Sequence, residues 1–222
     1  MSGVLVLDRD GTGLAAALRA GGLDAEVAAG WTPGRDHLVT VAPPLELEPL
    51  AELESDMWLE RFRRWVEEPF LVVQAWLRDL VARDEAGCWV AVTSNLGTQP
   101  FPLAGAVGSF SAALHTLVKV AAVEYGPRGI RANAVAVGFR EGEAPPWIDV
   151  ERAAADTPAG RLARLADVAA TVAWLLAPEA EHVNGEIVRV NGGFTITRAS
   201  TVAPSDAAEE RLLDEDWRGL AP

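Results

Sequence analysis

The sequence predicts an α/β fold built on a doubly wound, mostly parallel sheet in three layers. Short apolar runs alternate with longer segments of helical character, which is the pattern of a sheet covered by helices on both faces. The chain has 222 residues, half of them hydrophobic, so it can bury one sizeable core. We expect one domain over residues 1–198, followed by an acidic tail over residues 199–222.

Six apolar runs are expected to form the strands. Their continuous hydrophobicity is typical of parallel strands that are buried on both faces. They cover residues 4–7, 25–29, 38–42, 89–93, 130–137 and 187–190.

Four segments have helical character, and they cover residues 14–19, 57–83, 106–125 and 165–176. In the second, Pro69 is expected to kink the helix or to begin a new segment. The same segment carries a stripe of large side chains at helical spacing, of which we expect some to face the core and the rest to face a partner. The stripe consists of Trp58, Phe62, Trp65, Val72 and Trp76.

Charge and composition exclude several classes of function. The net charge is −13, so phosphate backbones and anionic lipid should repel the chain, and we expect neither nucleic acid nor membrane as a partner. A single cysteine, Cys88, rules out a disulfide within the chain, and three widely spaced histidines give no support for a metal site. No uninterrupted apolar run of about 20 residues is expected to span a bilayer. The start of the sequence has no basic leader, so a cytoplasmic location is expected.

The turn after the first strand allows two interpretations. Gly11-Thr12-Gly13 could end a glycine loop that places a dinucleotide pyrophosphate at a helix N-terminus. The segment Asp8-Arg9-Asp10-Gly11-Thr12 also resembles the first motif of the haloacid dehalogenase-like phosphatases. That resemblance implies a nucleophilic Asp8, an acid/base Asp10 and Mg²⁺. Residues 92–95 resemble that family's second motif, but no acidic pair follows Val137 to complete a metal site.

Three segments of the C-terminal half carry a more specific pattern. They are Gly-Pro-Arg-Gly-Ile-Arg-Ala-Asn-Ala-Val-Ala-Val-Gly-Phe at 126–139, Pro-Ala-Gly-Arg-Leu at 158–162, and Val-Asn-Gly-Glu-Ile-Val-Arg-Val-Asn-Gly-Gly at 183–193. Together they resemble the short-chain dehydrogenase/reductase family, and in particular its 3-oxoacyl-carrier-protein reductases. The resemblance runs in family order from about Val4 to about Phe194 and implies a Rossmann-like fold.

The resemblance implies NAD(P)-dependent hydride transfer, for which the family uses a tyrosine, a lysine four residues later and a serine. Residues 87–94 resemble the strand that ends at this serine, which is retained as Ser94. Aligned without a gap, the tyrosine position falls on Val107 and the lysine position on Ser111. Valine cannot transfer a proton, and a serine hydroxyl carries no positive charge. The only tyrosine, Tyr125, and the only lysine, Lys119, lie elsewhere on the same predicted helix.

The cofactor side of the resemblance is also altered. Asp8 stands where the family has threonine or glycine, and Pro43-Pro44 replaces a glycine turn. Between Ala29 and Leu38 there is room only for a loop, so the fold should be truncated at the edge that holds the cofactor's adenine. We expect no bound cofactor, with Asp8 and Asp10 capping the first helix and filling its anion site.

These losses predict a catalytically degenerate short-chain dehydrogenase/reductase-like subunit. Its expected partner is an active member of the family in a hetero-oligomer, or a second copy in a homodimer, because the helices that form the family's subunit interfaces are kept. One alternative is an active NAD(P)-dependent oxidoreductase with an atypical site. Two others are an Mg²⁺-dependent phosphatase using Asp8 and Asp10, and a small-molecule binder that reuses the vacated cleft.

Overall fold

The structure is a computed structural model that describes residues 3–143 and 148–196. Its centre is a six-stranded sheet in the order β2-β1-β3-β4-β5-β6, with every neighbouring pair parallel. The strands are β1 (Val4–Leu7), β2 (Ala25–Val27), β3 (His37–Val41), β4 (Gly87–Ser94), β5 (Ile130–Val137) and β6 (Ile187–Val190). The predicted doubly wound sheet is therefore confirmed.

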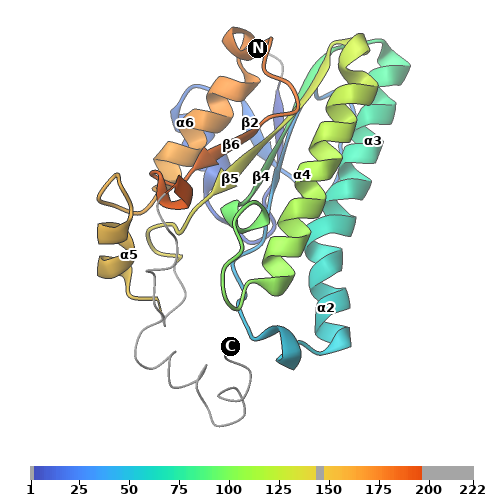
Figure 1. The fold of residues 1–222 in the computed structure, drawn as a ribbon. Helices are drawn as coiled ribbons and strands as arrows, with labels where there is room; N and C mark the ends of the chain where they lie inside the picture. Colours follow the sequence, from blue (N-terminus) through green and yellow to red (C-terminus); the bar gives the residue numbers. More distant parts are fainter. Residues whose placement is uncertain (1–2, 144–147, 197–222) are drawn as a thin grey trace.

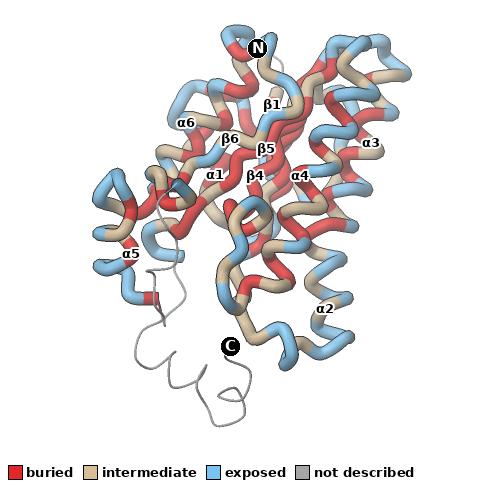
Figure 2. Tube along the Cα trace, viewed as in Figure 1, coloured by how far each residue is buried: buried red, intermediate tan, exposed pale blue. Residues whose placement is uncertain are grey.

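Helices cover both faces of this sheet and give the expected three layers (Figure 1). They are α1 (Leu14–Ala20), α2 (Ser55–Phe62), α3 (Glu68–Arg83), α4 (Gly105–Tyr125), α5 (Val150–Asp156) and α6 (Leu165–Leu176). One core lies between the sheet and α1 with α6, and another between the sheet and α3 with α4. The central strands are buried between these layers (Figure 2), as their uninterrupted apolar sequences require.

Most predicted elements are found, with shifts at their ends. The strand 130–137, the strand 187–190 and the helix 165–176 match to the residue. The second strand ends two residues early, at Val27, and the third begins one residue early and ends at Val41. The fourth strand is longer than predicted because Gly87, Cys88 and Ser94 also pair with β5.

The predicted helical region over 57–83 is divided into two α-helices, and the new segment expected at Pro69 is present. It is interrupted by a π-helical turn over Arg63–Glu67, and α3 then begins at Glu68 with Pro69 in its first turn. Proline is common in the first turn of a helix because its fixed φ is compatible with helical geometry. The prediction also missed the short helix α5.

The aromatic stripe of this region faces inward. Trp65 and Trp76 are almost fully buried, and Trp58 and Phe62 pack against Phe110 of α4 with ring centroids 4.7 and 5.8 Å away. Trp65 and Trp76 therefore belong to the part of the stripe that was expected to face the core. Phe62 is a member of the stripe that is also exposed, and the other exposed apolar side chains of α2 and α3 are Met57, Leu59, Phe70 and Leu71.

Two further expectations concern the length of individual segments. Residues 28–36, between β2 and β3, contain no helix or strand, so the predicted truncation at this edge is present.

The prediction that no segment is long and apolar enough to cross a membrane is wrong for Gly105–Arg128. This segment contains α4, whose buried face packs against the sheet, and a core helix passes the same test of length and composition. The predicted tail over 199–222 lies outside the described residues.

Candidate functional site

The carboxyl ends of the central strands meet at one edge of the sheet, where open α/β sheets bind their ligands. A cleft of about 70 Å³ lies there. Its lining comes from the turn after β1, the loop after β3, the end of β4 and the segment after β5. Ligand pockets usually have about 300–1,000 Å³, so this cleft is small for a dinucleotide or a drug-sized molecule.

Ser94, the predicted catalytic residue, lies at the end of β4 and lines this cleft. Its hydroxyl oxygen accepts a hydrogen bond from the Leu96 N–H at 3.2 Å, which begins the short turn after the strand. Its own N–H donates to Ser111 Oγ at 3.4 Å. Position 111 of α4 therefore faces Ser94.

The two other family positions hold side chains without acid–base chemistry. Val107 is 1% exposed and packs in an apolar cluster with Trp65 and Phe110. Ser111, one turn further along α4, is fully buried. Tyr125 lies at the far end of the same helix against the core under α3 and α4, and Lys119 is exposed. Neither side chain lines the cleft.

Sequence analysis assigned no role to His115, which is the next residue on this face of α4 after Ser111. Its Nε2 lies 2.8 Å from Thr93 Oγ1, and both residues are buried. Burial, together with the positive charges of Lys119 and Arg189, lowers the pKa of His115 to about 4. The imidazole is therefore neutral at physiological pH. The only sequence signal for the contact between His115 and Thr93 was that His115 lies four residues after Ser111 and so on the same face of the helix.

The turn after β1 is organised by the buried carboxylate of Asp8. Asp8 Oδ1 accepts from the Thr12 N–H and Oδ2 from the Thr12 hydroxyl, each at 2.9 Å. The prediction that Asp8 and Asp10 cap the first helix is wrong. The N-cap of α1 is Gly13, whose φ of +82° suits glycine, and the first N–H of the helix, that of Leu14, donates to Thr12 Oγ1 at 3.4 Å. Asp10 instead forms an ion pair with Arg64 at 2.9 Å.

A second charged group enters the cleft from the segment after β5. Arg140 is only 11% exposed at its side chain, and its Nε donates to Glu143 Oε2 at 2.7 Å. A second contact joins Arg140 Nη2 to Glu143 Oε1. Burial lowers the pKa of the Arg140 guanidinium, and the negative charge of Asp8 raises it. Sequence analysis did not identify this pair.

These residues do not fit a dinucleotide cofactor. The Thr12 amide, which a phosphate would need at the start of the turn, already donates to Asp8. A phosphate about 4 Å from this carboxylate would be repelled by about 4 kcal/mol at an effective dielectric constant of about 20. Micromolar binding provides only about 8 kcal/mol. Pro43, Pro44 and Leu45 also line the cleft and leave it too small for a nucleotide.

The geometry gives no support to the phosphatase alternative. Asp8 is held by Thr12 and Asp10 by Arg64, so the two carboxylates do not converge on one point. Across residues 3–143 and 148–196, no group of three or more histidine, cysteine, aspartate and glutamate side chains could hold a metal ion.

Comparison with known proteins identifies relatives over most of the chain. A family model described as enoyl-(acyl carrier protein) reductase matches residues 23–195. The chain is 32% identical to the vibriobactin-specific 2,3-dihydro-2,3-dihydroxybenzoate dehydrogenase of Vibrio cholerae, over 73% of this chain and 67% of that one. It is 34% identical to the L-xylulose reductase of Bos taurus, over 73% of this chain and 68% of that one.

Solved structures show the same fold at lower identity. The acetoin dehydrogenase of Enterobacter cloacae has a TM-score of 0.75 at 24% identity and covers 92% of this chain and 100% of its own. A putative 2-deoxy-D-gluconate 3-dehydrogenase of Agrobacterium tumefaciens with bound NADP has a TM-score of 0.75 at 20% identity, over 86% of this chain and 96% of its own.

Proposed function

This chain belongs to the short-chain dehydrogenase/reductase family of NAD(P)-dependent oxidoreductases, and we propose that it is a non-catalytic member. In this proposal it has lost its own hydride-transfer site. It assembles with an intact oxidoreductase of the same family and supports that subunit's structure or substrate pocket.

One observation carries the proposal: the two helix positions that should hold the acid–base pair are filled by Val107 and Ser111. Position 111 faces Ser94 through a hydrogen bond, which supports the assignment of Val107 and Ser111 to these two positions. Val107 has no proton to give, and a neutral hydroxyl cannot lower a neighbouring pKa as an ammonium does. Ser94 alone could orient a carbonyl group but could not protonate it.

The proposed contact surface for the partner is the outer face of α3 and α4, which the family resemblance assigns to subunit assembly. Phe70 and Leu71 of α3 and Val120 and Val123 of α4 are exposed on these helices. A groove of about 290 Å³ runs between the two helices, with Phe70, Val120 and Tyr125 in its lining. Apolar and aromatic side chains of this kind are typical of the centre of a protein interface.

The test is size-exclusion chromatography with mass determination, with and without an intact family member. We expect a complex with that member and no NAD(P)H oxidation by the isolated chain. Val120→Glu in the groove should abolish the complex, whereas Val150→Glu on α5 should leave it intact. The two valines are matched controls because they are 44% and 46% exposed. A stable lone monomer, or turnover by the isolated chain, would contradict the proposal.

The relatives' names favour a second candidate, an active NAD(P)-dependent oxidoreductase with an atypical site. The relatives compared above are named dehydrogenases and a reductase, and Ser94 still lines the cleft. This candidate predicts NAD(P)H oxidation by the purified chain with aldehyde or ketone substrates. Turnover that disappears in Ser94→Ala but persists in Ser109→Ala, an exposed position on α4, would favour it over the first proposal.

A further inference from the structure

We infer that a strap of the chain's own ion pairs crosses the crevice between β1 and β3, beside the small cleft that Ser94 lines, and that this chain takes up no dinucleotide there. The inference deepens the proposed function without depending on it, because a non-catalytic subunit could still hold a nucleotide. It rests on three observations: the position of the crevice, the side chains that cross it, and their balance of charge.

The order of the strands determines where a ligand crevice of this sheet lies. β1 pairs with β2 on one side and with β3 on the other, and every strand after β3 lies beyond β3. The order of the sheet therefore reverses between β1 and β3. In doubly wound sheets a ligand binds in the crevice outside the carboxyl ends of the strands at this switch point.

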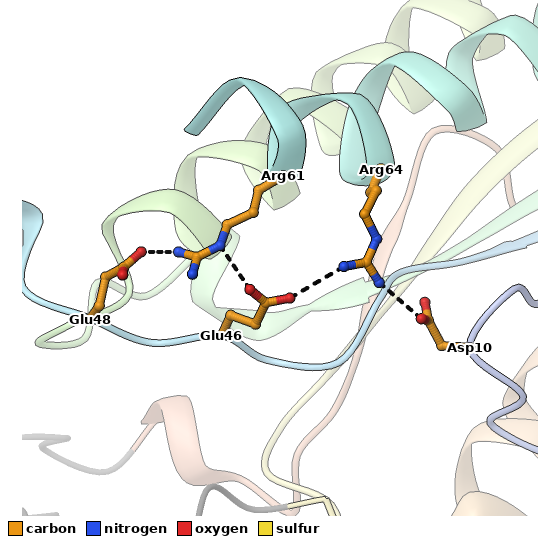
Figure 3. Close-up of polar contacts among 5 residues, drawn as sticks. All are labelled: Asp10, Glu46, Glu48, Arg61 and Arg64. Carbon is orange, nitrogen blue, oxygen red and sulfur yellow. Dashed lines mark hydrogen bonds and ion pairs between the residues drawn. The ribbon is translucent and has the colours of Figure 1, made fainter. Parts of the chain in front are cut away.

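A chain of five charged side chains crosses this region (Figure 3). Arg64 Nη2 lies 2.9 Å from Asp10 Oδ1, in the turn after β1, and Arg64 Nη1 lies 3.4 Å from Glu46 Oε1, in the loop after β3. Arg61 Nε continues the chain to Glu46 Oε2 at 2.8 Å, and its Nη1 contacts Glu48. These residues form what we call the strap.

The π-helical turn places the central member of the strap. Arg64 lies within Arg63–Glu67, immediately before Trp65, which is buried and lines the cleft beside Ser94. π-Helical turns arise mostly as single-turn interruptions of an α-helix and occur frequently at functional sites. Here the π-helical turn directs the Arg64 side chain toward the turn after β1 and the following side chain, Trp65, into the interior.

A second ion pair lies beside the strap. Arg9 Nη1 is 2.7 Å from Glu68 Oε2 at the start of α3, and its Nη2 donates to the Ala29 carbonyl at 2.9 Å. The space left between these groups is about 20 Å³, with Leu7, Val41 and Pro43 in its lining. This is about the room that one water molecule needs.

The balance of charge opposes an anionic ligand. In the strap and the second pair, four carboxylates face three guanidinium groups, and each of these guanidinium groups contacts a carboxylate. Asp8 adds a further buried carboxylate at the neighbouring turn. A pyrophosphate could therefore form an ion pair with one of these arginines only by displacing a carboxylate from it.

The first experiment is calorimetric titration of the full chain with NADH and NADPH. We expect no heat of binding at millimolar nucleotide. Micromolar binding that protects the amides around Asp10 from hydrogen exchange would overturn the inference. If the chain binds nucleotide, forms the complex with an intact family member and has no activity of its own, only this inference fails. If it remains a lone monomer and binds no nucleotide, only the proposed function fails.

The second experiment tests the strap directly with two neighbouring arginines. Arg64→Gln should raise hydrogen exchange several-fold in the turn after β1 and in the loop around Glu46. Arg63→Gln is the matched control, because within residues 3–143 and 148–196 the ion pair of Arg63 is with Glu67 of its own helical region, at 3.9 Å. Asp10→Asn removes the same contact from the other side and should reproduce the effect of Arg64→Gln. Equal exchange in the Arg63 and Arg64 variants, or no change in Asp10→Asn, would contradict the strap.

Discussion

Acidification is expected to destabilise the fold through His115, the buried residue behind the candidate site. Its pKa is about 4 in the folded protein, against about 6.5 for an exposed imidazole. Protonation would place a charge in a buried position whose Nε2 already lies 2.8 Å from Thr93 Oγ1, near the positive charges of Lys119 and Arg189. The unfolded chain therefore takes up this proton at higher pH than the folded protein does.

The sign and size of the effect follow from this difference. Because the pKa is depressed on folding, the contribution to stability is complete above about pH 6.5 and is lost as the pH falls toward about 4. Between about pH 7.5 and about pH 5.5, the free energy of unfolding should fall by about 1.3 kcal/mol through His115 alone. The limit at lower pH is about 3 kcal/mol, since each unit of pKa difference corresponds to about 1.4 kcal/mol.

Urea unfolding followed at a series of pH values measures this loss. His115→Gln retains hydrogen-bonding capacity but does not titrate, so its stability should depend less steeply on pH than that of the wild type. His182→Gln, at an exposed position, should retain the wild-type dependence. Burial also lowers the pKa of His37, so the stability of every variant will still depend on pH. The test is therefore the difference in pH dependence between the variants. An unchanged pH dependence in His115→Gln would refute the reasoning.

Three further predictions concern the fold around the site. Val107→Tyr combined with Ser111→Lys should destabilise the protein by at least about 3 kcal/mol and give no NADPH oxidation, because both positions are buried and the new bulk and charge have no space or partner. Asn133→Ala should cost about 2–4 kcal/mol in urea unfolding, because its buried side chain makes two hydrogen bonds to the segment before β6. Gly192→Ala should lower the melting temperature, because its φ is +60° and a Cβ would lie 2.6 Å from Thr157 Cγ2.

The first and the third of these changes have a control on the same chain. Ser109→Lys adds the same charge at an exposed position of α4 and should leave the melting temperature unchanged. Gly160→Ala has a similar φ of +67° but meets no atom within 4 Å, so it separates backbone strain from collision at Gly192. A stable and active Val107→Tyr/Ser111→Lys protein would show that the family's site needs only these two side chains, which contradicts the proposed loss of the whole site.

The order of the strands and helices was predictable because it follows from local periodicity. Apolar runs mark buried parallel strands, and the strand 187–190 and the helix 165–176 were predicted to the residue for that reason. The contact of position 111 with Ser94 was also predictable, because a helix without insertions fixes which of its residues share one face. The π-helical turn at Arg63–Glu67 was not, since its sequence is compatible with a continuous helix.

The sequence by itself determined the sheet, its covering helices and the residues at the family's catalytic positions, because each depends on spacing along the chain. Only the tertiary structure decided how the site is filled. Arg64 meets Asp10 across 54 positions of sequence, and His115 meets Thr93 across 22. With 19 basic and 32 acidic residues, the sequence allows many such pairings. Folding selects among them because an ion pair or hydrogen bond forms only where the packed elements bring two side chains within reach.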